Sequence, residues 1–291
     1  MPKAKSKLKL SYHEELKLRE KILKHVSEIF RRPHGGVSPF SSLSSLWSSS
    51  SISRHSSTRT SAPPPPPPPP FKPDQSVLLV GEGNFSFAHT LAENILKTGD
   101  SIIATTLDSE RILKRKYDDA HEHISALIQK GGKVMYNVDA TQLDKCKELK
   151  NKRFDKIVFN FPHAGAGIKD QDRNILENQK LVKAFLISCI PFLSSRRHYS
   201  DKYDGEIFLS LKSGLPYDNW NIKNIIKSIG NLVIRATNPF IPSQYPGYQH
   251  RRTLGFQEGI SKGDNEEISD KKAKILLIGK KNDPKKSKKR R

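Results

Sequence analysis

The sequence predicts an α/β fold in which a mostly parallel β-sheet is covered by helices on both faces. From Val77 onward, short apolar runs alternate with segments of helical periodicity, and this alternation is typical of parallel sheets. The first run, Val77–Val80, ends in a Gly-x-Gly turn that leads into an amphipathic segment. Such a turn lets a buried strand pass into a helix with little side-chain bulk between them.

The apolar runs predict seven strands, each bounded by residues that favour turns or helices. The strands are expected at Val77–Val80, Ser101–Leu107, Lys133–Val138, Phe154–Phe161, Glu206–Leu211, Leu232–Thr237 and Lys274–Gly279. Helices are expected at Phe87–Leu96, Ser109–Lys130, Asn174–Phe192 and Asn219–Ile229. The gap between the last two strands shows no clear helix and contains the aromatic and basic segment PFIPSQYPGYQHRRTLGF.

Composition divides the 291 residues into three parts. Residues 1–70 form a basic N-terminal extension whose Ser-rich segment and eight consecutive prolines indicate a linker. Residues 71–281 carry the strand–helix pattern, and residues 282–291 form a basic C-terminal tail. Because only 35% of the residues are hydrophobic, we expect the basic termini to be disordered.

The net charge of +21 is concentrated at the two ends of the chain. Residues 1–70 carry 12 basic and four acidic side chains, and the chain ends in KKSKKRR. Tracts of this kind suit a polyanionic partner, since each neutralised phosphate releases counterions. The alternative is a nuclear-import signal combined with general solubility, and we favour both roles together.

The two cysteines, Cys146 and Cys189, are too few for a disulfide framework or a four-cysteine zinc site, which favours a reduced intracellular compartment. No apolar stretch reaches membrane-spanning length. Residues 31–61 are rich in Ser and Arg, as in mitochondrial transit peptides, but the first thirty residues carry four glutamates, which such peptides avoid. We expect a monomer with no bound metal and no membrane association.

The turn after the first strand is the first candidate site, because a Gly-rich loop lets a cofactor approach the backbone. Its candidate cofactor-binding residues are Gly81, Glu82, Gly83, Asn84, Phe85 and Ser86. Ser86 stands where a dinucleotide fingerprint has its third Gly or Ala. Turns of this type serve several cofactors, and some serve none.

Two aspartates follow the next strands and are the other candidate cofactor ligands. Asp108 ends the second strand, where an acid accepts hydrogen bonds from the ribose of an adenosine, although it also suits a helix N-cap. Asp139 ends the third strand, where it suits an adenine amino group nearly as well as a capping or turn role.

The fourth strand ends in Asn160, Phe161, Pro162 and His163. Proline fixes the backbone there, the amide offers a donor and an acceptor, and the aromatic ring suits stacking on a nucleobase. The alternative is a turn with a buried Asn cap. Adenosine-cofactor methyltransferases carry a related Asn/Asp-Pro-Pro-aromatic element at this place, where it grips the nitrogen to be methylated.

Two later loops combine basic and aromatic residues, as proteins that bind unpaired nucleotides do. Their candidate RNA-binding residues, together with Phe161, are Lys212, Tyr217, Tyr248, His250, Arg251 and Arg252. A solvated loop with two buried tyrosines explains the later loop equally well.

Taken in order, GEGNFSFA, NFPHAG, LKSGLPYDNW and YPGYQHRRT resemble the family of 25S rRNA (uridine-N(3))-methyltransferase-like proteins, from about Phe71 to Lys280. The same domain resembles part of the ferredoxin-fold anticodon-binding domain-containing proteins. The resemblance implies a Rossmann-like class I methyltransferase fold, S-adenosyl-L-methionine as methyl donor, ribosomal RNA or pre-ribosomal particles as partner, and a location in the nucleus and nucleolus.

On this reading the reaction is N(3)-methylation of a uridine in large-subunit rRNA. Methylation of a pyrimidine carbon usually needs a cysteine nucleophile, and NFPH has none, so nitrogen is favoured. We assign Asn160, Pro162 and His163 to catalysis: Asn160 orients the target base, and His163, with His250 second, is the best-placed general base. One alternative is a non-catalytic ribosome-assembly factor that binds rRNA. Another, an NAD-dependent oxidoreductase, is disfavoured by Ser86 and the basic tails.

Overall fold

The computed structural model describes residues 68–195, 204–255, 268 and 272–281. All of them belong to one unit of the chain, Pro63–Arg291. The expectations for residues 1–67 and for the tail at 282–291 lie outside the described residues. Within the described part, no helix is long and apolar enough to cross a membrane.

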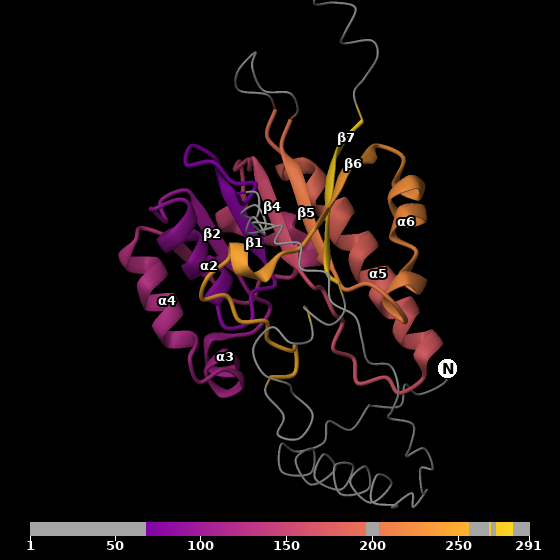
Figure 1. The fold of residues 1–291 in the computed structure, drawn as a ribbon, viewed down its shortest axis with the longest axis horizontal. Helices are drawn as coiled ribbons and strands as arrows, with labels where there is room; N and C mark the ends of the chain where they lie inside the picture. Colours follow the sequence, from indigo (N-terminus) through magenta and orange to yellow (C-terminus); the bar gives the residue numbers. More distant parts are fainter. Residues whose placement is uncertain (1–67, 196–203, 256–267, 269–271, 282–291) are drawn as a thin grey trace, which may run out of the picture. The chain divides into compact units, whose positions relative to one another are not determined.

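One mixed sheet organises the described residues (Figure 1), and it confirms the predicted strand number. In spatial order β3-β2-β1-β4-β5-β7-β6, the first five strands run parallel and β7 runs antiparallel to both β5 and β6. The strands are β1 (Val77–Val80), β2 (Ile102–Thr105), β3 (Lys133–Met135), β4 (Lys156–Asn160), β5 (Glu206–Leu211), β6 (Leu232–Pro239) and β7 (Lys274–Lys280).

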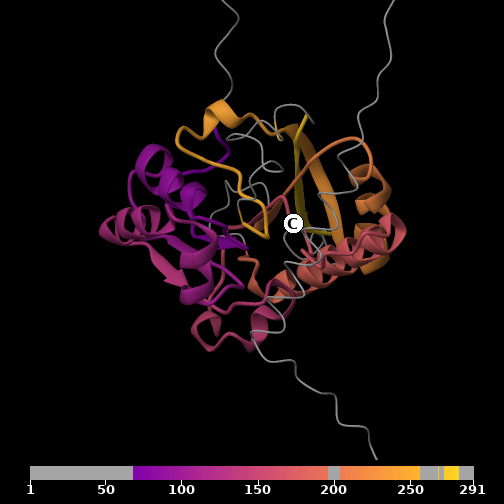
Figure 2. The same ribbon diagram turned by 90° about the horizontal axis from the view of Figure 1, so that it is seen from below.

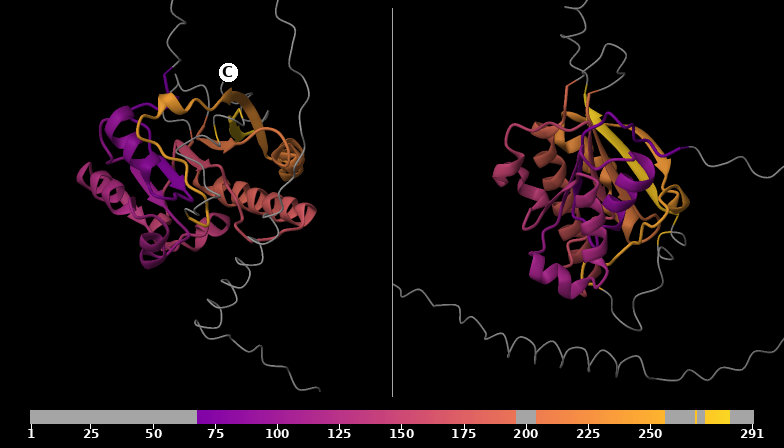
Figure 3. Two further views of the ribbon diagram at one scale, coloured as in Figure 1. Left: turned by 60° about the horizontal axis from the view of Figure 1, so that its bottom comes forward. Right: turned by 90° about the vertical axis from the view of Figure 1, so that its left-hand side faces the viewer.

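Helices cover both faces of the sheet, as Figure 3 shows with α4 and α5 on opposite sides. One face carries α2 (Ser86–Thr90), the π-helical turn η1 (Leu91–Ile95), α3 (Glu110–Lys116) and α4 (Ala120–Gln129). The other carries α5 (Gln171–Cys189) and α6 (Ile222–Ile229). Short 3-10 helices η2 to η6 lie at Ala140–Lys145, Lys147–Leu149, Ile190–Phe192, Tyr217–Trp220 and Pro242–Gln244.

The central strand β1 separates two hydrophobic cores by the alternation of its side chains. Val77 and Leu79 pack with the α2–α4 side, whereas Leu78 and Val80 pack with the α5–α6 side. All four are almost fully buried. Because both faces are covered, every position of the strand is apolar, which is why the run VLLV is continuous rather than alternating.

The helix expected over Ser109–Lys130 is two helices, α3 and α4, separated at Tyr117. Tyr117 takes an extended backbone conformation, and its buried side chain donates a hydrogen bond to the carbonyl oxygen of Arg252 at 2.8 Å. This long-range contact was not visible in the local pattern. Cys146 lies between the two 3-10 helices η2 and η3.

A buried ion cluster joins the first residues of β4 and β5, at the opposite end of these strands from NFPH. Lys156 and Glu206 are register partners, and their charged atoms are 2.7 Å apart. Arg235 on β6 approaches the same carboxylate at 3.3 Å. Since all three side chains are at most 15% exposed, neither cation can be rehydrated when the carboxylate is removed.

We therefore expect Glu206→Gln to lower the free energy of unfolding by roughly 3 kcal/mol, because it removes the carboxylate that neutralises the buried Lys156 and also accepts from Arg235. Chemical denaturation of the purified protein measures this. Glu177→Gln is the matched control: it breaks a surface pair with Lys180 and should change stability by less than about 0.5 kcal/mol. Equal effects of the two substitutions would contradict the expectation.

Candidate active site

The strand order places a crevice at the carboxyl ends of β1 and β4. The chain proceeds from β1 to β2 and β3 on one side and resumes at β4 and β5 on the other. Loops leaving the two central strands therefore diverge, and ligands of open α/β sheets bind at this switch point. The turn after β1 and the NFPH segment at the end of β4 face each other there.

Two backbone features shape the turn after β1. Gly81 has a φ of +69°, and a Cβ at this position would overlap the ring of Phe159. Phe85 has a φ of +65°, which is rare for a bulky residue, yet its ring is fully buried. The packing of the ring holds the turn in this conformation and keeps the backbone of Gly83 close to the crevice.

Glu82 is a buried carboxyl group inside this turn. It accepts a hydrogen bond from the backbone N–H of Ala88 at 3.3 Å. Burial raises the pKa of Glu82 to about 7, and the bond from Ala88 opposes the shift only in part. The group therefore changes its protonation state near neutral pH.

The segment after β6 is tied across this turn (Figure 2). Ser86 donates from its hydroxyl to the carbonyl oxygen of Gln249, and the N–H of Gln249 donates back to the same hydroxyl at 3.0 Å. Thr90 and Asn94 both donate to the carbonyl oxygen of Pro246. Residues 245–254, named the late loop below, thus form one wall of the crevice.

A polar network joins the late loop to the turn and to the start of α4. The amide of Asn84 donates to Asp119 at 2.9 Å and to the side-chain oxygen of Gln249 at 3.1 Å. Arg251 donates to the same two acceptors at 2.8 and 2.7 Å. Bonds from Arg251 and Asn84 outweigh the cost of burial and lower the pKa of Asp119.

Asp108 and Asp139 both have partners within the chain. The amine of Lys116 donates to both carboxylate oxygens of Asp108 at 2.8 Å. Ser109, not Asp108, caps α3. Asp139 caps η2 and accepts from the backbone N–H and hydroxyl of Thr141. The capping alternative is therefore seen for Asp139, and the adenine role of Asp139 and the ribose role of Asp108 stay predictions.

The NFPH segment is held from behind by α5. Phe161 has a φ of +50°, a second rare conformation at the crevice. The N–H of Ala164 donates to the side-chain oxygen of the buried Asn178 at 2.9 Å, and Asn178 in turn donates to Asn174. Asn178 lies on the otherwise apolar face of α5, a signal that sequence reasoning passed over.

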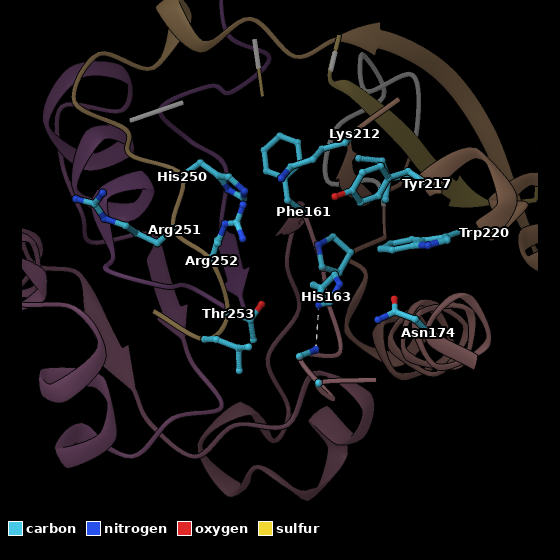
Figure 4. Close-up of a pocket in the computed structure, with 15 residues that line it drawn as sticks. Phe161, His163, Asn174, Lys212, Tyr217, Trp220, His250, Arg251, Arg252 and Thr253 are labelled. Carbon is cyan, nitrogen blue, oxygen red and sulfur yellow. Dashed lines mark hydrogen bonds between the residues drawn. The ribbon is translucent and has the colours of Figure 1, made fainter. Parts of the chain in front are cut away.

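A cavity of about 260 Å³ opens on one side of NFPH (Figure 4). Its walls come from NFPH, the loop after β5, the first turn of α5 and the late loop. Predicted residues in its lining are Phe161, Pro162, His163, Lys212, Tyr217, His250, Arg251 and Arg252. Trp220, Asn174, Thr253 and Leu254 line it as well and had not been assigned a role.

A smaller cavity of about 40 Å³ lies between the glycine turn and the late loop. Gly81, Glu82, Gly83, Asn84 and Ser86 line it together with Asn160. His250 and Arg251 line both cavities. NFPH is thus divided: Asn160 faces the turn, whereas the three residues after it face the larger cavity.

Asn160 has an unmet hydrogen-bonding capacity at this junction. Its side-chain oxygen accepts from the hydroxyl of Ser210 at 2.7 Å, but its buried amide nitrogen has no partner within the described protein. Leaving a buried donor unpaired costs about 1–3 kcal/mol. Such a group indicates a place where a ligand completes the bonding.

Some of the predicted RNA-binding side chains have contacts inside the protein. Tyr248 is 7% exposed, and its ring lies against Phe87 and Phe240 at 5.3 and 5.9 Å between centroids. Tyr245 is also buried, so this part of the loop has the two buried tyrosines that the alternative interpretation expected. Arg251 points away from the other labelled residues in Figure 4, toward Asp119. Contact of Tyr248 or Arg251 with RNA stays a prediction.

Comparison with known proteins now identifies the family. A model described as BMT5-like, rRNA (uridine-N3-)-methyltransferase BTM5-like, matches residues 78–252. The chain belongs to this family. The fold and the resemblance predicted from the motifs are confirmed.

Named relatives agree with this membership. The 25S rRNA (uridine(2634)-N(3))-methyltransferase of Saccharomyces cerevisiae is 32% identical over 65% of this chain and 69% of its own length. Heavy metal-associated isoprenylated plant protein 41 of Arabidopsis thaliana and the human ferredoxin-fold anticodon-binding domain-containing protein 1 are each 32% identical, over 64% and 60% of this chain. The chain spans only 34% and 27% of those two longer proteins. TrmN from Thermus thermophilus aligns structurally over 72% of this chain and 45% of its own, with 16% identity and a TM-score of 0.40.

The buried Glu82 gives the family domain of this chain a pH-dependent stability. Its pKa is about 7 in the folded protein and 4.5 when unperturbed. The native state therefore binds the proton of Glu82 more tightly than the unfolded chain does. The stabilisation that the protonated group provides is fully present below pH 4.5 and is lost as the pH rises through 7. This single group should contribute roughly 3 kcal/mol to that fall.

We expect Glu82→Gln to remove this component, so that its free energy of unfolding exceeds that of the natural protein by more at pH 8 than at pH 5. Urea titrations at several pH values measure the difference. Glu93→Gln is the control: a surface bond from Lys130 lowers the pKa of Glu93, so its titration lies below pH 4.5 and the difference from the natural protein should stay constant between pH 5 and 8. A constant difference for Glu82→Gln across this range would disprove the expectation.

Proposed function

We propose that the protein is an S-adenosyl-L-methionine-dependent methyltransferase that methylates N(3) of a uridine in large-subunit (25S) rRNA. The observation that carries the proposal is the pairing of two cavities with different chemistry across NFPH. One is built from a glycine turn, and the other from aromatic and cationic side chains. Family membership supports the same reaction.

The residues around the glycine turn fit the methyl donor. Gly81 and Gly83 leave the backbone open, and a Cβ on Gly83 would already come within 3.3 Å of Arg251. The unpaired amide nitrogen of Asn160 offers a donor on the opposite side. Asp108 has acceptor capacity beyond its bonds to Lys116, since a carboxylate has about four acceptor positions. When bound, S-adenosylmethionine supplies an electrophilic methyl carbon.

The walls of the larger cavity fit a nucleobase taken out of the RNA stack. Phe161, Tyr217 and Trp220 offer aromatic surface, and Lys212 and Arg252 offer positive charge. Stacking together with charge neutralisation is how proteins hold unpaired nucleotides. The protein would then contribute mainly by fixing the base against the methyl group, an effect that supplies much of the barrier reduction in such reactions.

The positions of the cysteines favour a ring nitrogen as methyl acceptor. Cys189, the last residue of α5, is fully buried in the core, and Cys146 lies near β3 in a different surface cavity. Neither lines the two cavities at the switch point. A mechanism that needs a cysteine nucleophile on the pyrimidine ring therefore has no residue to use.

The remaining parts of the proposal concern the whole protein. Residues 71–281 would form the methyltransferase domain, and the basic segments at 1–70 and 282–291 would add affinity for rRNA or pre-ribosomal particles. We propose a monomer that acts in the nucleolus. The described residues contain no group of three or more metal-ligating side chains.

Nucleoside analysis of rRNA tests the reaction. We expect 3-methyluridine to be present in large-subunit rRNA of cells with the natural protein and lost in cells without it. Asn160→Ala should reduce it by at least roughly 100-fold, since it removes a group that would hold the reacting pair in place. Normal methylation with Asn160→Ala at normal protein levels would remove Asn160 from the site.

Calorimetry tests the methyl donor separately from the acceptor. S-adenosylmethionine should bind saturably to the purified protein, and Gly83→Arg should abolish binding by filling the small cavity. Ile128→Arg, at a position 54% exposed on α4, is the matched control that adds the same charge away from both cavities. Absence of binding to the natural protein, with rRNA binding intact, would favour a non-catalytic assembly factor.

A further inference from the structure

One loop leads from NFPH to α5 and forms part of the larger cavity. Residues 163–170, named the connecting loop below, end at the N-cap of α5. His163, Gly165 and Gly167 of this loop line the cavity. Both glycines have a positive φ, of +60° and +63°. The path of the connecting loop therefore decides where the ring of His163 and this wall of the cavity lie.

The connecting loop has little packing of its own. None of its residues is buried, and a Cβ on Gly167 would meet no atom within 4 Å. A segment with so few buried apolar contacts opens at a low cost in free energy unless hydrogen bonds hold it. Those bonds come from one buried side chain of α5.

Asn178 is that side chain. It is 1% exposed and lies among the apolar residues of α5 that face the core. Its side-chain oxygen accepts from the backbone N–H of Ala164 at 2.9 Å. Its amide nitrogen donates to the backbone oxygen and to the side-chain oxygen of Asn174, both at 2.8 Å. The oxygen and both hydrogens of the amide are thus used.

The bonds of Asn178 extend to the cavity by two routes. On one route, the residue after its backbone partner is Gly165, whose N–H donates to Nδ1 of His163 at 3.0 Å (Figure 4). On the other route, Asn174 donates from its amide to the carbonyl oxygen of Ile168 at 3.3 Å, and Asn174 itself lines the cavity. One buried amide therefore ties the connecting loop near its start and near its end.

Stability alone does not explain an amide at this position. A buried amide must find hydrogen bonds to offset the cost of leaving water, whereas an apolar side chain has no such cost. Leucine branches at Cγ as asparagine does, and it would pack against the same core without any of these bonds. The amide is explained when the connecting loop has to follow one path.

We propose that Asn178 is a positioning residue for methyl transfer, which fixes the connecting loop against the base in the larger cavity through its bonds to Ala164 and Asn174. This deepens the proposed function and rests on it. Asn178 touches neither substrate nor methyl donor, since it lines neither cavity at the switch point. Its effect therefore falls on the rate of the bound complex and not on binding of the methyl donor.

Single-turnover kinetics test this role. The full chain and its variants are mixed with S-adenosylmethionine and with rRNA from cells that lack the protein, and 3-methyluridine is measured over time. Asn178→Leu should lower the rate at saturating rRNA by roughly 10- to 100-fold, because a misplacement of about 1 Å at a reacting pair has an effect of this size. The Kd for S-adenosylmethionine, measured by calorimetry, should stay unchanged.

Two further variants separate positioning from stability. Asn178→Asp keeps an oxygen for the N–H of Ala164 but places a buried carboxyl group opposite the two oxygens of Asn174. It should therefore retain more of the rate than Asn178→Leu while being no more stable to denaturant. Val182→Ala, one turn further along α5 in the same core, removes buried methyl groups and should lower the denaturation midpoint without changing the rate.

Hydrogen exchange observes the connecting loop without the reaction. Ala164 is exposed, yet we expect its amide to exchange slowly in the natural protein because the acceptor on Asn178 is buried. Asn178→Leu should speed the exchange of this amide by roughly tenfold or more, while the amides of β1 keep their protection. NMR of the full chain measures both.

Several outcomes would overturn the proposal. They are an unchanged rate with Asn178→Leu, equal losses with Asn178→Asp and Asn178→Leu, a loss of the same size with Val182→Ala, or equal exchange of the Ala164 amide in the natural protein and in Asn178→Leu. Failure of the proposed function is distinguishable, since the natural protein would then form no 3-methyluridine, and the role of Asn178 would fall with it. Equal rates for the natural protein and Asn178→Leu would leave the function standing and remove only that role.

Discussion

The site depends on the attachment of the late loop to the turn after β1. Two strands at the centre of a parallel sheet produce a crevice by topology alone, but the crevice has only one wall. The reciprocal hydrogen bonds between Ser86 and Gln249 supply the other wall. His250 and Arg252 reach the cavity because the residue before them is fixed to the glycine turn.

This attachment also explains how charge is distributed. Arg251 links Asp119 to Gln249, and it lines the larger cavity together with its neighbours His250 and Arg252. Because Arg251 pairs with Asp119, its guanidinium points away from the side chains of His250 and Arg252 (Figure 4). The ion pair between Arg251 and Asp119 therefore fixes a loop that also forms part of the cavity lining.

The sheet and the cavity-forming segments could be predicted from the sequence, because they follow from local patterns. The boundaries of β1 and β5 agree with the apolar runs, and NFPH lies at a strand end as expected. Contacts over long separations could not be predicted. Tyr117 interrupts the helix after β2 because of a partner 135 positions away, and Asp108 pairs with Lys116 one helix along. The role of His163 as a base stays a prediction, and its bond from the N–H of Gly165 could not be foreseen, since only coordinates show which ring nitrogen already has a donor.

The position of β7 has a consequence for how the molecule is made. This strand is the last of the described strands in sequence order, yet it lies between β5 and β6. Within the described residues β6 pairs only with β7, so β6 can join the sheet only once β7 has been synthesised. The late loop is part of the connection between these two strands. A site that depends on this loop would be completed only after β7 has been synthesised, when the glycine turn and NFPH have already had time to form.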